Sequence, residues 1–141
     1  KYVNEGPNIG ELHYFDENNI CIVSGENKDD ILKKNLTIDD YYKMGFEKCI
    51  EKIYKVLGNN DTYFTVDIDG IDPTFAPGTG TPEVGGFNVR EAQQIIRSLN
   101  KLSLIGGDIV EVSPPFDVKN ITSLVAATIG FEMLCTMTNT N

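Results

Sequence analysis

The chain of 141 residues is 40% hydrophobic and 23% charged, a composition typical of one folded domain and not of a disordered chain. Its formal net charge of −9 argues against a nucleic acid or an anionic membrane as partner, because like charges repel at long range. A small cationic ligand or a metal ion is the better match.

Cysteine usage and targeting features bear on the compartment. Cys21, Cys49 and Cys135 are odd in number and never form a CxxC pair, which predicts reduced, buried thiols and neither a disulfide framework nor a zinc site. No segment reaches the roughly 18 uninterrupted apolar residues of a membrane span, and no apolar leader opens the chain. We expect a soluble protein of the cytoplasm or an organellar matrix that is not secreted, and, because the chain opens at Lys1 without Met, a piece of a longer protein.

The first predicted elements are a strand, a helix and a second strand. The apolar run at 19–25 predicts a buried strand. Thr37 and Asp40 form a capping signature at the start of a helix that runs to Val56. Its apolar positions recur every three or four residues, at Ile38, Tyr42, Phe46, Cys49, Ile53 and Val56. The β-branched and aromatic run at 62–68 predicts the second strand.

The second half of the chain begins with a long aperiodic segment, 70–87, whose Pro, Gly and Thr residues predict a shaped functional loop. Asn88 and Glu91 form a second capping signature, followed by a helix with Ala92, Ile95, Ile96 and Leu99 on one face. Residues 102–112 predict a third strand. Residues 121–137 are apolar on nearly every face, which predicts a helix buried between neighbours.

This alternation predicts an α/β fold, with a mostly parallel sheet and helices on both faces. We expect residues 1–141 to form a single partial domain of about three strands and three helices. Parallel sheets bind ligands at the carboxyl ends of their strands. Asp67 and Glu111 both lie near such ends, directly before irregular loops.

The acidic pair Asp67 and Asp69 is the strongest chemical signal. Two residues apart on a strand, their carboxylates project from one face, where a divalent cation would relieve their repulsion. A turn cap and an ion pair would explain the same two acids without a metal. In the following loop, Thr79 and Thr81 either line a pocket or support a tight turn, and Asp72 is expected in a turn.

Two other acidic motifs share part of this pattern. A calcium-binding EF-hand loop that began at Asp67 would need Gly at position six and Glu at position twelve, and the chain has neither there. A phosphatase of the haloacid dehalogenase type begins with a similar DxDG turn, but the likeness stops after Gly70. The phosphatase remains a weaker alternative.

The run "TVDIDGIDPTFAPGTGTPEVGG", followed by "GGDIVEVSPPFD", resembles the ureohydrolase family of arginase and agmatinase. The family signature is a hydroxyl residue, two aspartates around an apolar residue, a proline, a Pro-Gly pair and a later glycine. All of its places are filled, by Thr65, Asp67, Asp69, Pro73, Pro77, Gly78 and Gly86. The likeness covers about 63–134 and implies the family's three-layer α/β/α architecture.

The resemblance also implies a chemistry. Family members hydrolyse guanidinium compounds to urea and an amine with two manganese ions, whose bridging hydroxide attacks the guanidinium carbon. By resemblance, Asp67 would bridge the two ions, Asp69 would bind one of them, and Glu111 would orient the guanidinium group. Thr81 is the second candidate for substrate binding. Such enzymes often assemble as trimers or hexamers, which we expect of the complete protein.

Within the family, "APGTGTPE" is more similar to agmatinase, which implies agmatine as substrate and putrescine and urea as products. Guanidinobutyrase, arginase and formimidoylglutamase remain alternatives. The family's upstream GGDH and DAHxD ligand motifs do not occur, and His13 matches neither of them. We therefore predict that these residues correspond to the carboxyl-terminal half of a ureohydrolase and are inactive alone. A noncatalytic binding subunit with the same fold is the other alternative.

Overall fold

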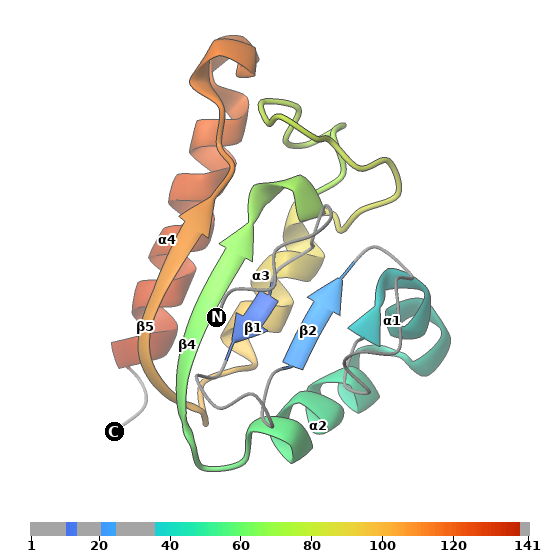
Figure 1. Ribbon diagram of the computed structural model, residues 1–141, viewed down its shortest axis with the longest axis vertical. Coiled ribbons are helices and arrows are strands. Elements are labelled where there is room, and N and C mark those ends of the chain that lie inside the picture. Colours follow the sequence, from blue (N-terminus) through green and yellow to red (C-terminus); the bar gives the residue numbers. More distant parts are fainter. Residues whose placement is uncertain (1–10, 14–20, 25–35, 139–141) are drawn as a thin grey trace.

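The computed structural model describes residues 11–13, 21–24 and 36–138. Among these residues is a five-stranded sheet with the order β3-β2-β1-β4-β5. Two long neighbouring strands at one side of the sheet, β4 and β5, lead to the acidic residues (Figure 1). The strands are β1 (Glu11–His13), β2 (Cys21–Ser24), β3 (Leu36–Thr37), β4 (Asp61–Asp67) and β5 (Ser103–Val110).

The sheet is mixed in strand direction. β4 and β5 are parallel over seven residue pairs, from Asp61 with Ser103 to Asp67 with Val110. β2 and β3 are also parallel, whereas β1 is antiparallel to both β2 and β4, each over two pairs. Most of the pairing is therefore parallel, as predicted, and the antiparallel strand β1 was not foreseen.

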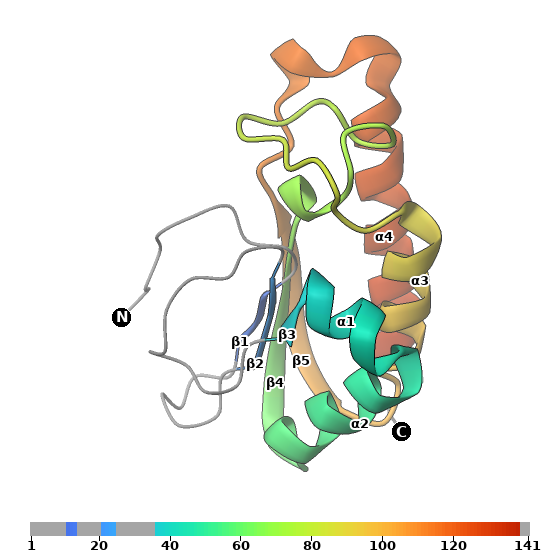
Figure 2. The same ribbon diagram turned by 90° about the vertical axis from the view of Figure 1, so that its right-hand side faces the viewer.

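The helices of the described segments lie on one face of the sheet (Figure 2). Together with the strands they confirm the predicted α/β class and the partial domain. The helices are α1 (Ile38–Met44), α2 (Phe46–Leu57), α3 (Val89–Arg97) and α4 (Ile121–Thr138).

The single helix predicted for 37–56 is wrong, because Gly45 divides it into α1 and α2. Gly45 has a φ of 85° and separates the two helices, a backbone conformation that residues with a Cβ rarely adopt. The predicted start is confirmed: the Thr37 side chain accepts a hydrogen bond from the Asp40 amide, and the Asp40 carboxylate accepts one from the Thr37 amide. Tyr42, predicted on the apolar face, is 60% exposed, and the neighbouring Tyr41 is buried in its place.

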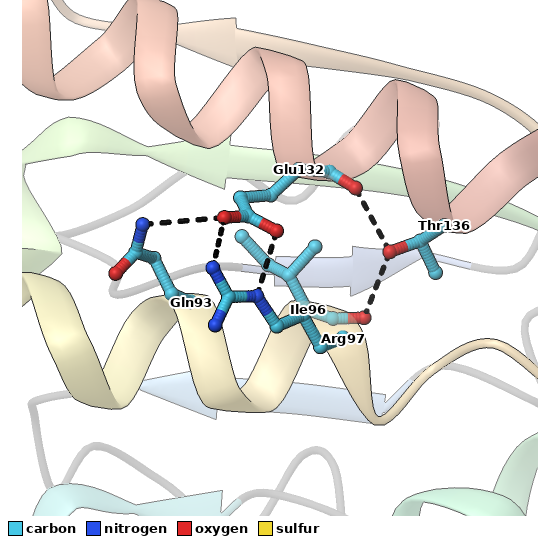
Figure 3. Close-up of polar contacts among 5 residues, drawn as sticks. All are labelled: Gln93, Ile96, Arg97, Glu132 and Thr136. Carbon is cyan, nitrogen blue, oxygen red and sulfur yellow. Dashed lines mark hydrogen bonds and ion pairs between the residues drawn. The ribbon is translucent and has the colours of Figure 1, made fainter.

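Helix α3 begins at the predicted cap, where Asn88 and Glu91 exchange hydrogen bonds. It packs against α4 through a group of contacts that we call the helix seam, formed by Gln93, Ile96, Arg97, Glu132 and Thr136 (Figure 3). In the helix seam, Arg97 forms an ion pair with Glu132. The Thr136 hydroxyl donates to the backbone carbonyls of Glu132 and Ile96. Both helices are thus held over the sheet.

Helix α4 is covered on one side only, which corrects the prediction of a helix buried between neighbours. Its inner side, including Ile129 and Met133, is buried in the core. Its outer side exposes Leu124, Phe131 and Leu134, each more than 60%. By length and composition alone, 118–138 could cross a membrane, but a core helix meets the same test.

The cysteine predictions are confirmed in part. Cys49 is a free, buried thiol on α2, and burial raises the pKa of that thiol. Cys135 is free and partly buried on α4. The side chain of Cys21 lies outside the described residues.

Candidate functional site

The predicted acids lie at the end of the sheet where the parallel strands β4 and β5 terminate (Figure 1). β4 ends at Asp67, and β5 ends at Val110, directly before Glu111. Both strands continue into irregular segments at this end, as predicted. The alternation of exposed and buried residues along β4 keeps Phe64 and Val66 in the core, so packing of the strand sets the position of the acids.

Asp67 and Asp69 do not share a strand face, because β4 ends between them. Residues 68–70 form a 3₁₀ turn, and the Asp67 side chain accepts a hydrogen bond from the Asp69 amide at 3.0 Å. The capping function that we considered for one of the acids is therefore performed by Asp67. The turn places Asp69 in the interior, where it is 2% exposed.

The Asp69 carboxylate is buried, and its two oxygens differ in their hydrogen bonding. The Thr81 hydroxyl donates a hydrogen bond to Oδ2, whereas no donor among the described residues reaches Oδ1. Burial raises the pKa of Asp69, the Thr81 hydrogen bond opposes that shift, and the charges of Glu111 and Glu83 add to it. A buried carboxylate oxygen without a donor is a favourable ligand for a cation.

Glu111 is exposed and has a φ of 66°, a conformation that is uncommon for residues other than glycine. Its charge acts on Asp69, so the structure brings together Asp69, Thr81 and Glu111 from three separate segments. We call the residues Asp69, Thr79, Thr81 and Glu111 the site rim. They place one exposed carboxylate, that of Glu111, beside the buried carboxylate of Asp69, which suits a cationic ligand.

Thr79 does not line a pocket, although that was one of its two predicted functions. Its side chain is 4% exposed, and its hydroxyl donates to the backbone carbonyl of Glu111 at 3.0 Å. The structural alternative is therefore correct for Thr79. The prediction for Asp72 is also confirmed, since its carboxylate accepts bonds within the loop from the Thr74 hydroxyl and the Gly85 amide.

Sequence reasoning missed Asp117, which caps the first turn of α4. Its carboxylate accepts bonds from the backbone amides of Thr122 and Ser123 and from the Ser123 hydroxyl. Burial favours the neutral carboxyl group, but these hydrogen bonds outweigh burial and lower its pKa. The available signal was an aspartate shortly before a long apolar run.

A complete metal centre is not assembled by the described residues. Within 11–13, 21–24 and 36–138, no group of three or more His, Cys, Asp and Glu side chains is arranged to hold a metal ion. Asp67 and Asp69 fit two ligands of a hard divalent cation, and the unpaired Oδ1 supports that fit. His13 lies on β1, and its side chain is outside the described residues.

Comparison with known proteins gives a consistent family assignment. The model of the arginase family matches residues 18–135. A guanidinopropionase of Pseudomonas aeruginosa is 49% identical over 98 residues, which cover 70% of this chain and 31% of that protein. An agmatinase of Blochmanniella floridana is 54% identical over 87 residues, covering 62% of this chain and 29% of that protein.

Solved structures of the same family resemble this fold. Proclavaminate amidino hydrolase from Streptomyces clavuligerus superposes with a TM-score of 0.74 and 38% identity, over 77% of this chain and 36% of that chain. Arginase from Bacillus subtilis superposes with a TM-score of 0.67 and 33% identity, over 72% of this chain and 36% of that chain. The 141 residues thus span about a third of the length of the proteins they match.

Proposed function

The chain belongs to the arginase family, and from that premise we propose that it is the carboxyl-terminal part of a manganese-dependent ureohydrolase. The reaction is hydrolysis of a guanidinium compound to urea and an amine. The observation that supports this most directly is the buried Asp69 carboxylate, with one oxygen paired by Thr81 and the other without a donor in the described part of the chain. Most buried side-chain oxygens of folded proteins have a hydrogen-bond partner, so the unpaired oxygen calls for a ligand or another explanation.

Manganese ions, when bound, supply the hydroxide that attacks the guanidinium carbon, because they lower the pKa of water. Asp67 and Asp69 would contribute carboxylate ligands, and the remaining ligands would come from residues outside these segments. The hydrogen bond that the Asp69 amide donates to the Asp67 side chain restrains the Asp67 carboxylate. Thr81 holds Asp69 in one orientation through Oδ2. Both contacts would lower the entropy lost on metal binding.

Glu111 is the proposed binding residue for the guanidinium group. A carboxylate accepts two parallel N–H bonds from a planar guanidinium, which fixes both its position and its orientation. Glu111 is exposed beside the buried Asp69. A substrate held there would present its central carbon to the proposed metal site.

Agmatine is the proposed substrate, because its second end is a cationic amine. Glu83 and Glu111 both act electrostatically on Asp69, so the rim of the site is acidic and repels a carboxylate on the substrate. A guanidino acid is the second candidate, supported by the 49% identity to a guanidinopropionase and the 44% identity to a guanidinobutyrase. We further propose that the complete protein forms a homo-oligomer, which light scattering would test.

The experiment is a urea-release assay on the complete protein that contains these residues, with Mn²⁺ and a panel of agmatine, guanidinopropionate, guanidinobutyrate and arginine. We expect agmatine to be hydrolysed with the highest kcat/KM. The matched variant for the proposed binding residue is Glu111→Gln, which retains the size of the side chain and removes its charge. Faster hydrolysis of a guanidino acid would reverse the substrate assignment, and no urea from any of them would support the noncatalytic alternative.

The 141-residue chain provides the second arm of the assay. We expect no urea release from it under the same conditions, because the described residues contain too few ligands for two metal ions. Manganese-dependent urea release by this chain alone would contradict that expectation. The sequence upstream of Lys1 separates an enzyme from a noncatalytic relative, since GGDH and DAHxD motifs would complete the ligand set.

A further inference from the structure

We propose that Thr79 is a positioning residue that holds the backbone of Glu111 in a left-handed conformation and so aims the Glu111 carboxylate at the substrate. The importance of Glu111 itself rests on the function proposed above. The conformational part of the inference rests on hydrogen bonds, a backbone angle and close contacts in this structure. It is therefore testable without an active enzyme.

The first observation is the backbone angle. Glu111 has a φ of 66°, where a residue with a Cβ is less stable than in the common regions by roughly 1–2 kcal/mol. Glu111 is also exposed, so burial of its own side chain does not offset that strain. Contacts made by the neighbouring backbone must stabilise this conformation.

The second observation is the set of bonds on either side of Glu111. The Thr79 hydroxyl donates to the Glu111 carbonyl at 3.0 Å, and Thr79 pairs with Val112 as an antiparallel bridge. The Ser113 amide donates to the Gly78 carbonyl at 2.8 Å. The loop after β4 and the segment after β5 are thus joined at consecutive positions directly beyond Glu111.

The third observation is that the loop is itself anchored, to the start of α4. The Gly78 amide donates to the Thr122 hydroxyl at 2.7 Å. A Cβ on Gly78 would lie 2.6 Å from both Cα and Cβ of Asp117, so only glycine allows this approach. Asp117 in turn caps α4. The loop that carries Thr79 is therefore bonded to the start of α4 at Gly78, and Thr79 joins the same loop to Glu111.

The geometry assigns different functions to two threonines of one loop. Thr79 is 4% exposed, and its hydroxyl bonds the backbone of Glu111. Thr81 is exposed, and its hydroxyl bonds the carboxylate of Asp69. One threonine orients the substrate-binding acid and the other orients the proposed metal ligand. Because χ angles start from the backbone, a change of φ at Glu111 would redirect its carboxylate.

The conformational test is a double-mutant cycle on the complete protein that contains these residues, with Glu111→Gly and Thr79→Val. We expect Glu111→Gly to raise Tm by about 3 °C, because glycine tolerates a positive φ. In the Thr79→Val background we expect less than half of that gain, since residue 111 is then free to relax. Thr136→Val is the matched control: Thr136 is also 4% exposed and bonds backbone carbonyls in the helix seam.

We expect the full Glu111→Gly gain in the Thr136→Val background. An equal gain in all backgrounds, or no gain in any, would overturn the positioning by Thr79. If Thr79→Val does not fold, Thr79→Ala replaces it in the cycle, because it removes the hydroxyl without placing a methyl group against the carbonyl. Both cycles are read by circular dichroism and need no catalysis.

The functional test uses the complete protein with Mn²⁺ and agmatine. We expect Thr79→Val to raise KM roughly tenfold, because a tenfold change corresponds to the loss of about one hydrogen bond. The Mn²⁺ content should not change, and Thr79→Ser should restore KM. An unchanged KM together with a positive cycle would overturn the link to substrate binding. A complete protein that releases no urea with or without the substitution would refute the proposed function, while the cycle would still decide the positioning.

Discussion

The site rim and the helix seam are both connected by threonine hydroxyls and carboxylates, yet their polar groups differ in how well they are satisfied. In the helix seam, Glu132 accepts bonds from Arg97 and Gln93, and Thr136 bonds two carbonyls (Figure 3). In the site rim, Asp69 has a buried oxygen that no donor in the described segments reaches, and Glu111 has a positive φ. The contacts of the helix seam are those of a stabilising interface, whereas the site rim combines a strained backbone with an unpaired carboxylate oxygen, as we expect of the proposed ligand site.

The largest expected effect is that of Asp69→Asn, which should lower the urea-release activity and raise the free energy of unfolding. In the complete protein we expect Mn²⁺-dependent urea release to fall roughly a hundredfold or more, as for loss of a metal ligand. In the 141-residue chain at pH 7 without metal, we expect the free energy of unfolding to rise by about 1 kcal/mol, because a buried charge is removed. Equilibrium unfolding in urea measures this second quantity.

The pH dependence of that gain has a definite sign. The pKa of Asp69 is raised above its ordinary value of 3.8, so its contribution to stability is fully present below 3.8 and is lost as the pH rises through the folded-state pKa. The advantage of Asp69→Asn should therefore disappear below about pH 4. If Asp69→Asn instead lowers the free energy of unfolding at pH 7, the buried charge of Asp69 does not destabilise the folded chain.

The second effect in size is that of Gly78→Ala, which should destabilise the chain by about 2 kcal/mol through overpacking against Asp117. Gly80→Ala is the control in the same loop, since a Cβ there meets no atom within 4 Å. We expect Gly80→Ala to change stability by less than about 0.5 kcal/mol. Equal effects of the two substitutions in thermal unfolding would argue against the close contact between the loop and α4.

A smaller effect is expected from acid titration of the cap on α4. The hydrogen bonds from Ser123 and Thr122 outweigh burial and lower the pKa of Asp117 below 3.8. Its stabilising contribution is present above pH 3.8 and is lost as the pH falls through the lower folded-state pKa. Thermal unfolding between pH 5 and pH 2 should show a shallower decline for Asp117→Asn than for the unmodified chain. Identical pH profiles would contradict the cap.

The smallest effect is expected in the helix seam, from Glu132→Gln. The Arg97 hydrogen bond lowers the pKa of Glu132, but the Arg97 side chain is 48% exposed, so solvent screens the pair. We expect a loss of about 0.5 kcal/mol, measured by urea unfolding, and no change in the urea-release activity of the complete protein. A loss of activity would show that the helix seam and the site rim are coupled.

Local signals in the sequence predicted the elements well, and nonlocal contacts explain the errors. The caps at Thr37 and Asn88 are both present, because each depends on residues three positions apart. The helix break at Gly45 was missed because the apolar spacing continues through it and a single glycine does not always end a helix. The outer side of α4 was misjudged, since composition does not reveal which side has a neighbour.

The sequence by itself determined the family and the identity of the acids, because the signature from Thr65 to Gly86 depends on spacing within one continuous segment. Only the tertiary structure decided what those residues contact. The bond from Thr79 to Glu111 joins residues 32 positions apart, and that from Gly78 to Thr122 joins residues 44 apart. The burial of one Asp69 oxygen, with no donor among the residues that the structure describes, likewise depends on the tertiary fold. Such contacts follow from packing, and spacing along the chain does not encode them.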